Sequence, residues 1–456
     1  MFTSTNPATG ETFAEHAALS DAQVEAKLAA AAAAYRRWRL TDYDERTVLL
    51  ARIADAFEAN RQELALMATR ETGKTLKSAR AEVDKCVAGF RLYAEQGPSF
   101  LSPVQVGGTT ARWLPMGPVL AIMPWNFPYW QVVRFLAPTI MAGNVGLLKH
   151  ASLTQGCAAL IERMVTEAGA PEGVFQNLAI GSASVAPLID DNRVTAVTLT
   201  GSEGAGMKVG EAAGRALKKV VLELGGSDPF IVMPSADLDA AAKTAVIART
   251  QNAGQSCICA KRMIVHSDVY DAFLDRFAGG MQALKIGDPE EEATEMGPLS
   301  SVAQRDEVLR QVGEAKAEGA TLLCGAEELD RPGAWMSAGV LTDVDPEGRI
   351  AKEELFGPVA MVFRAQDVDH AIALANDVPF GLGSTVFTQD RAEQARFVQD
   401  IEAGMTAVNT MLASTPGSPF GGVKRSGHGR ELGPWGLHEF MNLKAEMRDP
   451  GVKVGD

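Results

Sequence analysis

Residues 220–233 read VVLELGGSDPFIVM, two short apolar runs that flank a polar, glycine-rich segment beginning at Glu223. Short apolar runs bounded by turn residues are typical of buried strands. Similar runs alternate with helical patterns on both sides of this stretch, which favours βαβ units and parallel sheets. We therefore place the seam between two α/β halves here, at the kind of position where open α/β sheets bind ligands.

The same alternation of patterns predicts the elements of both halves. In the first half we predict strands at 119–123, 145–148 and 195–199. Helices are predicted near 155–168 and 204–215, after three N-terminal helices that run from a Ser20 N-cap to about Arg39, near 44–70 and near 75–96. The second half is predicted to contain strands at 229–233 and 262–266 and helices near 237–251, 268–284 and 303–318, and to continue to about 409.

Length and charge restrict the classes of function. At 456 residues the chain is long enough for roughly three domains. Its formal net charge of −14 argues against nucleic acid or an anionic membrane as a partner. The five cysteines are odd in number and widely scattered, which favours a reducing cytoplasm over a disulfide framework. We expect no signal peptide from the N-terminal pattern, no membrane span, and no metal site from the spacing of the six histidines.

Cys257 and Glu223 are the residues best suited to covalent chemistry. Cys257 follows a Gly-Gln-Ser turn and is expected near a helix end, where backbone dipoles lower the pKa of a thiol. Glu223 ends an apolar run, and burial there raises the pKa of a carboxyl group towards the range of a general base. Each residue alone is equally compatible with a structural cysteine or a surface glutamate. Together they indicate attack of sulfur on a carbonyl, followed by hydrolysis of a thioester.

Three further segments suit such chemistry. Asn126, held between two prolines, can direct its amide NH₂ towards an oxyanion, although an asparagine in a turn needs no such role. Gly201-Ser202 follows a strand and opens a helix, which is a weak signal for phosphate contact. Lys149 stands at the C-terminal end of a strand, where a cofactor ribose can be reached.

Taken together, these motifs resemble the NAD(P)-dependent aldehyde dehydrogenase superfamily. The resemblance covers about residues 113–440 and rests on Pro124-Trp125-Asn126-Phe127-Pro128, Lys149, Gly201-Ser202, Glu223-Leu224-Gly225-Gly226, Gly254-Gln255-Ser256-Cys257, Glu354-Leu355-Phe356-Gly357-Pro358 and the closing runs 419–422, 426–427 and 429–431. It implies an α/β fold with two Rossmann-like parallel domains and a β-arm that joins subunits into a homodimer or homotetramer. The implied divisions are a cofactor-binding domain of 1–97 and 119–225, a catalytic domain of 226–439, and an oligomerisation arm and tail at 98–118 and 440–456.

The resemblance also implies roles for individual residues. Cys257 would be the nucleophile, Glu223 the base that activates the hydrolytic water, and Asn126 an oxyanion donor. The implied cofactor contacts are Trp125, Lys149, Ser152, Gly201, Ser202, Leu224, Glu354 and Phe356. An aldehyde would thus become its carboxylic acid through a thiohemiacetal and a thioester, with a nicotinamide cofactor as the hydride acceptor. A catalytically idle protein of the same fold is disfavoured because the catalytic set is intact.

Within the superfamily, the sequence is most similar to the succinate-semialdehyde dehydrogenases. Arg134 and Ser414 match an arginine and a serine that bind the distal carboxylate of the substrate in those enzymes, although Arg134 is also compatible with a helix surface. A second arginine of many relatives is replaced here by Gln251. Glutarate semialdehyde and small uncharged aldehydes are therefore alternative substrates, and acyl transfer to coenzyme A is an alternative second step that Glu223 disfavours.

Two smaller signals concern the cofactor and redox control. Relatives specific for NAD often carry a glutamate three residues after the lysine, where this chain has Ser152. Loss of that carboxylate removes a repulsion against a 2′-phosphate, so we expect NADP to be preferred over NAD. Cys259 resembles a second cysteine that forms a reversible disulfide with the nucleophile in some relatives, although a passive, small apolar residue is the simpler interpretation.

Overall fold

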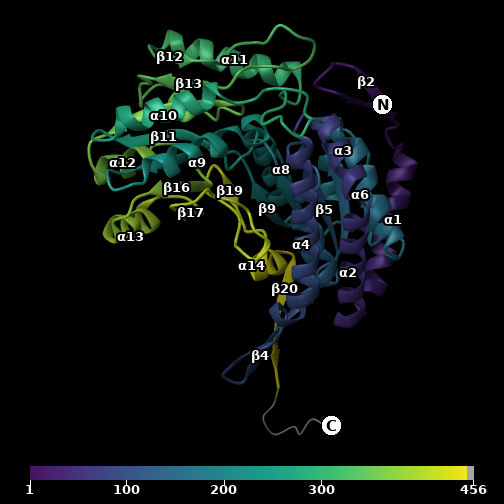
Figure 1. The fold of residues 1–456 in the computed structure, drawn as a ribbon. Helices are drawn as coiled ribbons and strands as arrows, with labels where there is room; N and C mark the ends of the chain where they lie inside the picture. Colours follow the sequence, from purple (N-terminus) through teal and green to yellow (C-terminus); the bar gives the residue numbers. More distant parts are fainter. Residues whose placement is uncertain (449–456) are drawn as a thin grey trace.

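The computed structural model describes residues 1–448, which form two mainly parallel sheets with helices on both faces and a projecting β-arm (Figure 1). The expected fold of two parallel α/β domains is thereby confirmed. Each sheet lies in its own hydrophobic core, because parallel strands between two helical layers are buried on both faces. No helix in the described part of the chain is long and apolar enough to cross a membrane.

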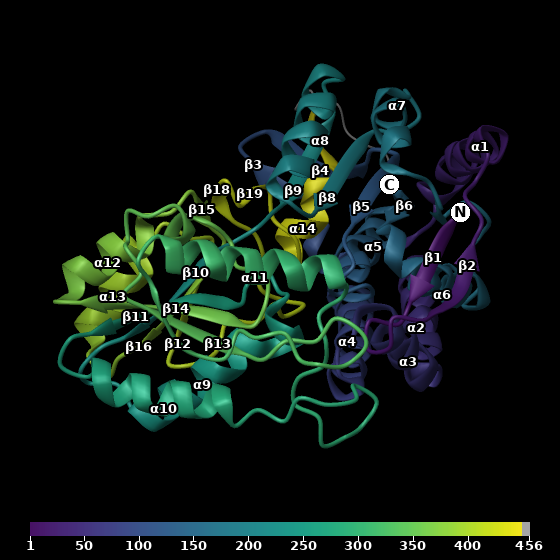
Figure 2. The same ribbon diagram turned by 90° about the horizontal axis from the view of Figure 1, so that it is seen from above.

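The first sheet has the strand order β19-β9-β8-β5-β6-β7, and only the β19–β9 pair is antiparallel. Its strands are β5 (Pro118–Met123), β6 (Val145–His150), β7 (Phe175–Asn177), β8 (Ala196–Thr200), β9 (Lys219–Glu223) and β19 (Gly427–His428). One face carries α5 (Trp130–Ala142) and α6 (Gln155–Glu167), and the other carries α7 (Val185–Asp190) and α8 (Glu203–Arg215) (Figure 2). Right-handed connections produce this arrangement, since the chain moves outward from β5 in both directions.

A hairpin and four helices precede this sheet: β1 (Phe2–Thr5), β2 (Thr12–His16), α1 (Asp21–Trp38), α2 (Tyr43–Ala59), α3 (Arg61–Thr72) and α4 (Leu76–Phe100). The predicted cap at Ser20 is confirmed, because its hydroxyl accepts the N–H of Gln23 within a capping box. The pattern over 44–70 forms two helices rather than one, since Asn60 ends α2 and precedes α3.

The second sheet has the order β12-β13-β14-β11-β10-β16-β17, with only β12 antiparallel to its neighbour. Its strands are β10 (Asp228–Val232), β11 (Ala260–His266), β12 (Thr321–Cys324), β13 (Gly339–Thr342), β14 (Val359–Ala365), β16 (Gly383–Phe387) and β17 (Met405–Val408). Its helices are α9 (Leu238–Thr250), α10 (Tyr270–Gln282), α11 (Val302–Ala317), α12 (Val368–Asn376) and α13 (Arg391–Asp400). A two-stranded ladder of β15 (Phe380–Gly381) and β18 (Val423–Lys424) lies apart from this sheet.

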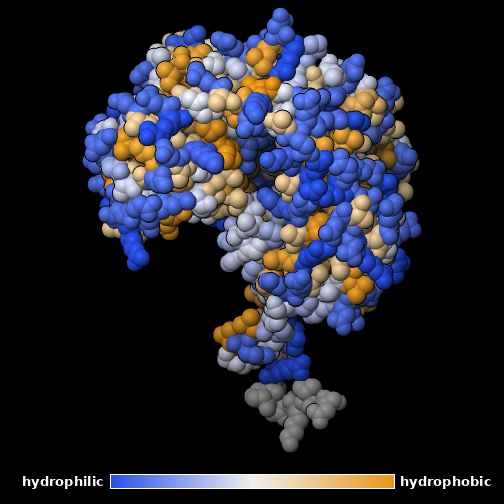
Figure 3. Space-filling model, viewed as in Figure 1, coloured by the Kyte–Doolittle hydropathy of each residue, from blue (hydrophilic) through white to orange (hydrophobic). Residues whose placement is uncertain are grey.

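The projecting arm is an antiparallel sheet of β3 (Val104–Val106), β4 (Thr109–Pro115) and β20 (Met441–Met447), in the order β20-β4-β3. It begins later than the expected residue 98, because α4 continues to Phe100. Apolar side chains are exposed on it in the space-filling view (Figure 3). The last part of the expected tail, 449–456, lies outside the described residues.

The segment after residue 419 returns from the second sheet to the first. β19 joins the first sheet, and α14 (Gly433–Glu439) packs against α4 and α5. Phe420 and Leu437 belong to the core of the first sheet, although the chain reaches them from the second. Because these apolar side chains are buried in the first core, the segment around them lies beside the end of β9. There Gly427 pairs with Glu223.

Candidate active site

The turn that carries Cys257 has an unusual backbone. After α9, the short 3₁₀ helix η3 (Gln251–Gly254) places Asn252 and Ala253 at φ 52° and Gly254 at φ 74°. Residues other than glycine are strained at such positive φ angles, and strained backbone of this kind tends to occur at functional sites. A Cβ at Gly254 would collide with the backbone of Gly357, so only glycine fits there. The glycine of the Gly-Gln-Ser-Cys motif therefore lets the turn that carries Cys257, here called the nucleophile turn, pack closely against the segment that carries Glu354.

Asn126 is tied directly to this turn. Its Nδ2 donates to the carbonyl of Gln255 at 3.0 Å, and its own carbonyl accepts from Nδ2 of Asn252 at 2.9 Å. Its Oδ1 accepts from Nε2 of Gln131 at 3.0 Å, which fixes the orientation of the amide. The second N–H of the amide is therefore held in a set direction beside the cysteine, as an oxyanion donor must be.

Cys257 lines a cavity of about 320 Å³ together with Asn126. Burial raises the pKa of the thiol to about 12, and the positive charges of Arg134 and Lys261 offset only part of that effect. The expectation that a helix end would lower this pKa is therefore wrong. The reason is that the turn follows the C-terminal end of α9, where helix dipoles do not favour an anion, while partial burial disfavours the thiolate.

Glu223 ends β9 and is fully buried. Neither of its carboxylate oxygens has a hydrogen-bond partner in the described residues. Burial and the negative charge of Glu431 raise its pKa well above the ordinary value of 4.5, against the opposing pull of Arg134. The expected upward shift of a general base is thus found. The carboxylate lies against Gly421, where a Cβ would come within 2.6 Å of Oε1.

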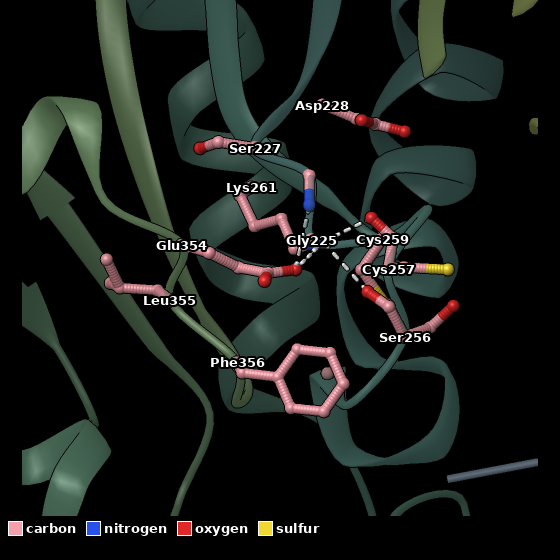
Figure 4. Close-up of polar contacts among 12 residues, drawn as sticks. Gly225, Ser227, Asp228, Ser256, Cys257, Cys259, Lys261, Glu354, Leu355 and Phe356 are labelled. Atoms are coloured by element: carbon pink, nitrogen blue, oxygen red, sulfur yellow. Dashed lines mark hydrogen bonds and ion pairs between the residues drawn. The ribbon is translucent and has the colours of Figure 1, made fainter. Parts of the chain in front are cut away.

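Lys261 connects the nucleophile turn to Glu354 (Figure 4). Its Nζ donates to the carbonyl oxygens of Ser256 and Cys257 at 2.8 and 2.6 Å and lies 3.1 Å from the Glu354 carboxylate. The side chain is completely buried, so these contacts replace its water shell. Glu354 also accepts the N–H of Gly226 at 3.2 Å. One buried ammonium therefore holds the nucleophile and a proposed cofactor ligand in a fixed relation.

The cavity collects most of the residues expected to contact a cofactor. Its walls include Trp125, Asn126, Gly201, Ser202, Leu224, Cys257, Glu354 and Phe356. The Trp125 and Phe356 rings meet edge to face at 5.8 Å between centroids. The N-terminus of α8, capped by Ser202, opens into the cavity, and Gly225 has no Cβ that would push against the Glu354 carboxylate. Backbone donors at a helix N-terminus, a carboxylate and an aromatic wall fit the phosphates, ribose and ring of a dinucleotide.

Lys149 and Ser152 lie beyond this cavity, at and after the end of β6. Lys149 is half-buried, and this burial lowers its pKa. Ser152 is exposed and begins the short 3₁₀ helix η1 (Ser152–Thr154). No carboxylate pairs with the Lys149 ammonium within residues 1–448. The ammonium can therefore bind a ribose hydroxyl or a phosphate.

Arg134 lies on α5, all of whose residues are buried, so it is not on a helix surface. Its Nε lies 2.7 Å from a carboxylate oxygen of Glu431 as an ion pair, without the alignment of a hydrogen bond. Its guanidinium stacks over the Phe420 ring at 4.3 Å, and Nη2 lies 3.5 Å from Oγ1 of Thr200. The proposed carboxylate anchor therefore already has an acidic partner from the closing segment.

The remaining predicted residues lie around the same region. Ser414 is buried and accepts the indole N–H of Trp130 at 2.8 Å. Cys259 is buried, and its sulfur contacts the carbonyl of Gln251 at 3.7 Å. Cys257 and Cys259 belong to one turn (Figure 4).

Four residues that shape the site were not predicted: Gln131, Asn252, Lys261 and Glu431. Asparagine is favoured at positive φ, so Asn252 carried a weak local signal. A buried lysine such as Lys261 has none, because lysine is usually exposed. Glu431 belongs to a quoted motif, but its contact with Arg134 depends on the return of the chain to the first domain.

The raised thiol pKa predicts a steep pH dependence of cysteine alkylation. Because burial raises the pKa of Cys257 to about 12, the rate of its alkylation by iodoacetamide in the purified protein should rise about tenfold per pH unit between pH 6 and 9. Peptide mass spectrometry would follow this residue separately from Cys324, the other half-buried cysteine. Lys261→Met should react more slowly, since a stabilising charge is lost. A rate that levels off below pH 8 would contradict burial of the thiol.

Comparisons with known proteins agree with this geometry. The profile of the aldehyde dehydrogenase family matches residues 1–445. A Mycobacterium tuberculosis protein named succinate-semialdehyde dehydrogenase NADP(+) 1 is 50% identical over 446 residues, covering 96% of this chain and 98% of that protein. The corresponding Mycolicibacterium paratuberculosis enzyme is 52% identical over 447 residues, covering 96% and 95%. The crystal structure of succinic semialdehyde dehydrogenase from Streptococcus pyogenes with NADP+ aligns with a TM-score of 0.95 at 36% identity, covering 98% of this chain and 99% of that one.

The family match spans nearly the whole chain and includes every motif on which the site is built. The whole chain also shares its fold with a solved structure at 36% sequence identity. On this combined ground, the chain belongs to the aldehyde dehydrogenase family.

Proposed function

We propose that the enzyme oxidises succinate semialdehyde to succinate with NADP. The observation that carries the proposal is that Cys257 and Asn126 line the same cavity as Glu354 and Phe356, so an aldehyde can meet a nucleophile and a nicotinamide ring there. The buried Arg134 and Ser414 add groups that suit a distal carboxylate. The near full-length relatives named as NADP(+) enzymes for this substrate support the same choice.

In the proposed reaction, the Cys257 thiol loses its proton to solvent, and the thiolate then adds to the aldehyde carbonyl as the carbonyl oxygen becomes an anion. The amide N–H of Asn126 that is not bound to Gln255 donates to this oxygen, together with the backbone N–H of Cys257. The bound cofactor supplies the acceptor for the hydride that leaves the carbon. Cys257 then carries a thioester. Lys261 holds Cys257 and the proposed ribose ligand Glu354 in a fixed relative position, because its ammonium contacts the backbone of Cys257 and the carboxylate of Glu354.

Glu223 is proposed to take a proton from the water that hydrolyses the thioester. Its raised pKa brings proton acceptance closer to neutral pH, as efficient general-base catalysis requires. The carboxylate rests against Gly421 and outside the cavity wall, so rotation of the side chain is needed to bring it towards Cys257. A carboxylate at this position favours hydrolysis over acyl transfer to coenzyme A.

The substrate assignment is tested by kcat/KM for three aldehydes with each cofactor: succinate semialdehyde, glutarate semialdehyde and butyraldehyde. We expect succinate semialdehyde with NADP to give the highest value, because butyraldehyde offers no carboxylate to Arg134. Product analysis with and without coenzyme A should give free succinate in both cases. Equal kcat/KM values for the acidic aldehydes and butyraldehyde would contradict the assignment, and a coenzyme A thioester would contradict hydrolysis.

Cofactor choice is predicted to depend on Ser152. Ser152→Glu places a carboxylate where the 2′-phosphate of NADP is expected, so kcat/KM with NADP should fall by at least about tenfold through charge repulsion. The value with NAD should hold or rise, since a carboxylate can accept hydrogen bonds from ribose hydroxyls. Ser152→Ala is the matched control, because it adds no charge, and it should keep the preference of the wild type. Unchanged NADP kinetics in Ser152→Glu would place the 2′-phosphate elsewhere.

A redox role is proposed for Cys259. A disulfide with Cys257 would consume the nucleophile, so peroxide should inactivate the wild-type enzyme and dithiothreitol should restore it. In Cys259→Ala the sulfur of Cys257 has no neighbouring thiol and oxidises further, so recovery should be largely lost. Activity before and after each reagent measures the effect. Full recovery of the Cys259→Ala enzyme would refute the switch.

The arm is proposed to join subunits into a homodimer or homotetramer in the cytoplasm. Its two edge strands β3 and β20 expose Val106 and Leu443, at 69% and 52%. Apolar strand edges of this kind are usually covered by another chain. The first sheet with 1–97 is proposed as the cofactor-binding domain and the second as the catalytic domain.

A further inference from the structure

Lys85 is a half-buried lysine in the middle of α4 that forms no ion pair within residues 1–448. Its ammonium lies 5.6 Å from the centroid of the Trp130 ring on α5. Burial disfavours the charged form and accordingly lowers the pKa of Lys85. A cation–π contact offsets part of this cost, but an anion would offset more. The side chain therefore has an unfilled capacity for a negatively charged partner.

The carboxylates nearest to Lys85 in the sequence are engaged elsewhere. Glu82 forms a buried ion pair with Lys74 and also accepts two backbone N–H groups at the start of α5. Asp84 pairs with Arg61 on the surface. Moving either carboxylate to Lys85 would break these contacts. The partner of Lys85 is thus more readily supplied by a ligand than by the chain.

Trp130 links Lys85 to the proposed carboxylate site. The indole N–H donates to Oγ of Ser414 at 2.8 Å, and Arg134 follows Trp130 by one turn of α5. The two helices pack closely here, since a Cβ at Gly89 would come 3.0 Å from the indole ring. Lys85 and Arg134 thus flank the same residue, Lys85 over the Trp130 ring and Arg134 one turn further along α5. An anion held by both would relieve their repulsion.

The proposed anchor needs such support. Arg134 is paired with Glu431, which cancels part of its attraction for a second carboxylate. Gln251 is neutral at the position where many relatives carry another arginine. The enzyme as a whole carries a net charge of −14, so its general field repels an anionic substrate. The proposed carboxylate site therefore needs a second positive charge that is not already paired with an acidic side chain.

We propose that Lys85 is a specificity-determining residue that binds the distal carboxylate of the substrate together with Arg134 and Ser414. The proposal rests on the proposed function in that it assumes a semialdehyde with a terminal carboxylate. It assigns to α4, an element of the N-terminal helices, the charge that Gln251 does not supply.

The test compares Lys85→Met with the wild type, using succinate semialdehyde and butyraldehyde. Loss of one charge-assisted contact should lower kcat/KM for succinate semialdehyde about ten- to fiftyfold, mainly through KM. The value for butyraldehyde should stay within about twofold, since methionine keeps the apolar stem beside Trp130. Lys85→Arg should recover most of the loss. The matched control is Lys77→Met, an exposed lysine on the same helix, which changes net charge equally and should leave both aldehydes unaffected.

Equal losses of Lys85→Met on both aldehydes, or no loss on either, would overturn the proposal. Inhibition by succinate, measured against butyraldehyde, separates this outcome from failure of the proposed function. If the wild type shows no preference for succinate semialdehyde, the proposed function fails, yet succinate should still inhibit through Lys85. In that case, an inhibition constant for succinate that is higher in Lys85→Met than in the wild type would support the contact between Lys85 and the anion. An unchanged inhibition constant would refute it.

Discussion

Replacing Cys257 with alanine is expected to reduce kcat for aldehyde oxidation by about 10⁴-fold or more, because no other thiol lines the cavity to form the covalent intermediate. Cys259 cannot substitute, since it is buried outside the cavity wall with its sulfur against the carbonyl of Gln251. Cofactor binding should persist, as Glu354, Phe356 and the start of α8 are untouched. Absorbance of the reduced cofactor measures turnover, and fluorescence titration measures binding.

Cys324→Ala is the matched control for this change. Cys324 is a half-buried cysteine on β12, at the edge of the second sheet and outside the cavity wall. Its replacement should leave kcat within about twofold, as is usual for substitutions away from a reacting centre. Substantial turnover in Cys257→Ala, above the level set by traces of wild-type enzyme, would exclude covalent catalysis at this position.

Replacing Glu223 with glutamine is expected to stop the cycle at the thioester. Loss of a general base should lower the steady-state kcat by about 10²- to 10⁴-fold. One equivalent of reduced cofactor per subunit should still form in a rapid initial phase, because hydride transfer precedes the hydrolysis that Glu223 assists. Stopped-flow absorbance measures this burst, and mass spectrometry of the intact protein detects the acyl group on Cys257.

Stability provides the control for this variant. A carboxyl whose pKa is higher in the folded than in the unfolded state destabilises the fold as pH rises above 4.5, because the unfolded chain loses its proton first. Glutamine removes this penalty, so Glu223→Gln should unfold at the same or a higher Tm than the wild type, with the largest difference at alkaline pH. Absence of the burst in a stably folded variant would instead assign Glu223 to a step before hydride transfer, such as deprotonation of Cys257.

Local patterns were sufficient for most of the individual elements. The strand runs at 119–123 and 195–199 lie within or beside β5 and β8, and the Ser20 cap begins α1 as expected. The errors concerned where helices begin and end. The single pattern over 44–70 contains two helices because Asn60 interrupts it, and α4 extends into the expected arm. Periodicity identifies which residues are buried in an element, but it locates the ends less well.

The candidate site was predictable where a residue type is itself restrictive. A thiol after a glycine turn, an asparagine between prolines and a carboxylate before two glycines keep their chemistry in any fold that brings them together. The raised pKa of the Glu223 carboxyl was predicted from its position after an apolar run, but the electrostatic state of the Cys257 thiol was not. The pKa of Cys257 is raised rather than lowered, because burial disfavours the thiolate and the turn follows a helix C-terminus.

The stretch 220–233 by itself determined the seam and the strands on either side, and the motifs from Pro124 to Glu431 together determined the family, since these depend on residue order and local periodicity. Only the tertiary structure decided which charges meet. Glu431 reaches Arg134 because apolar residues such as Phe420 and Leu437 return to the first core, and Lys261 reaches Glu354 because Gly254 lets two segments touch. Such contacts join residues far apart in sequence through packing of the whole chain, and the Coulomb interactions they create depend on distance and burial that no local pattern contains.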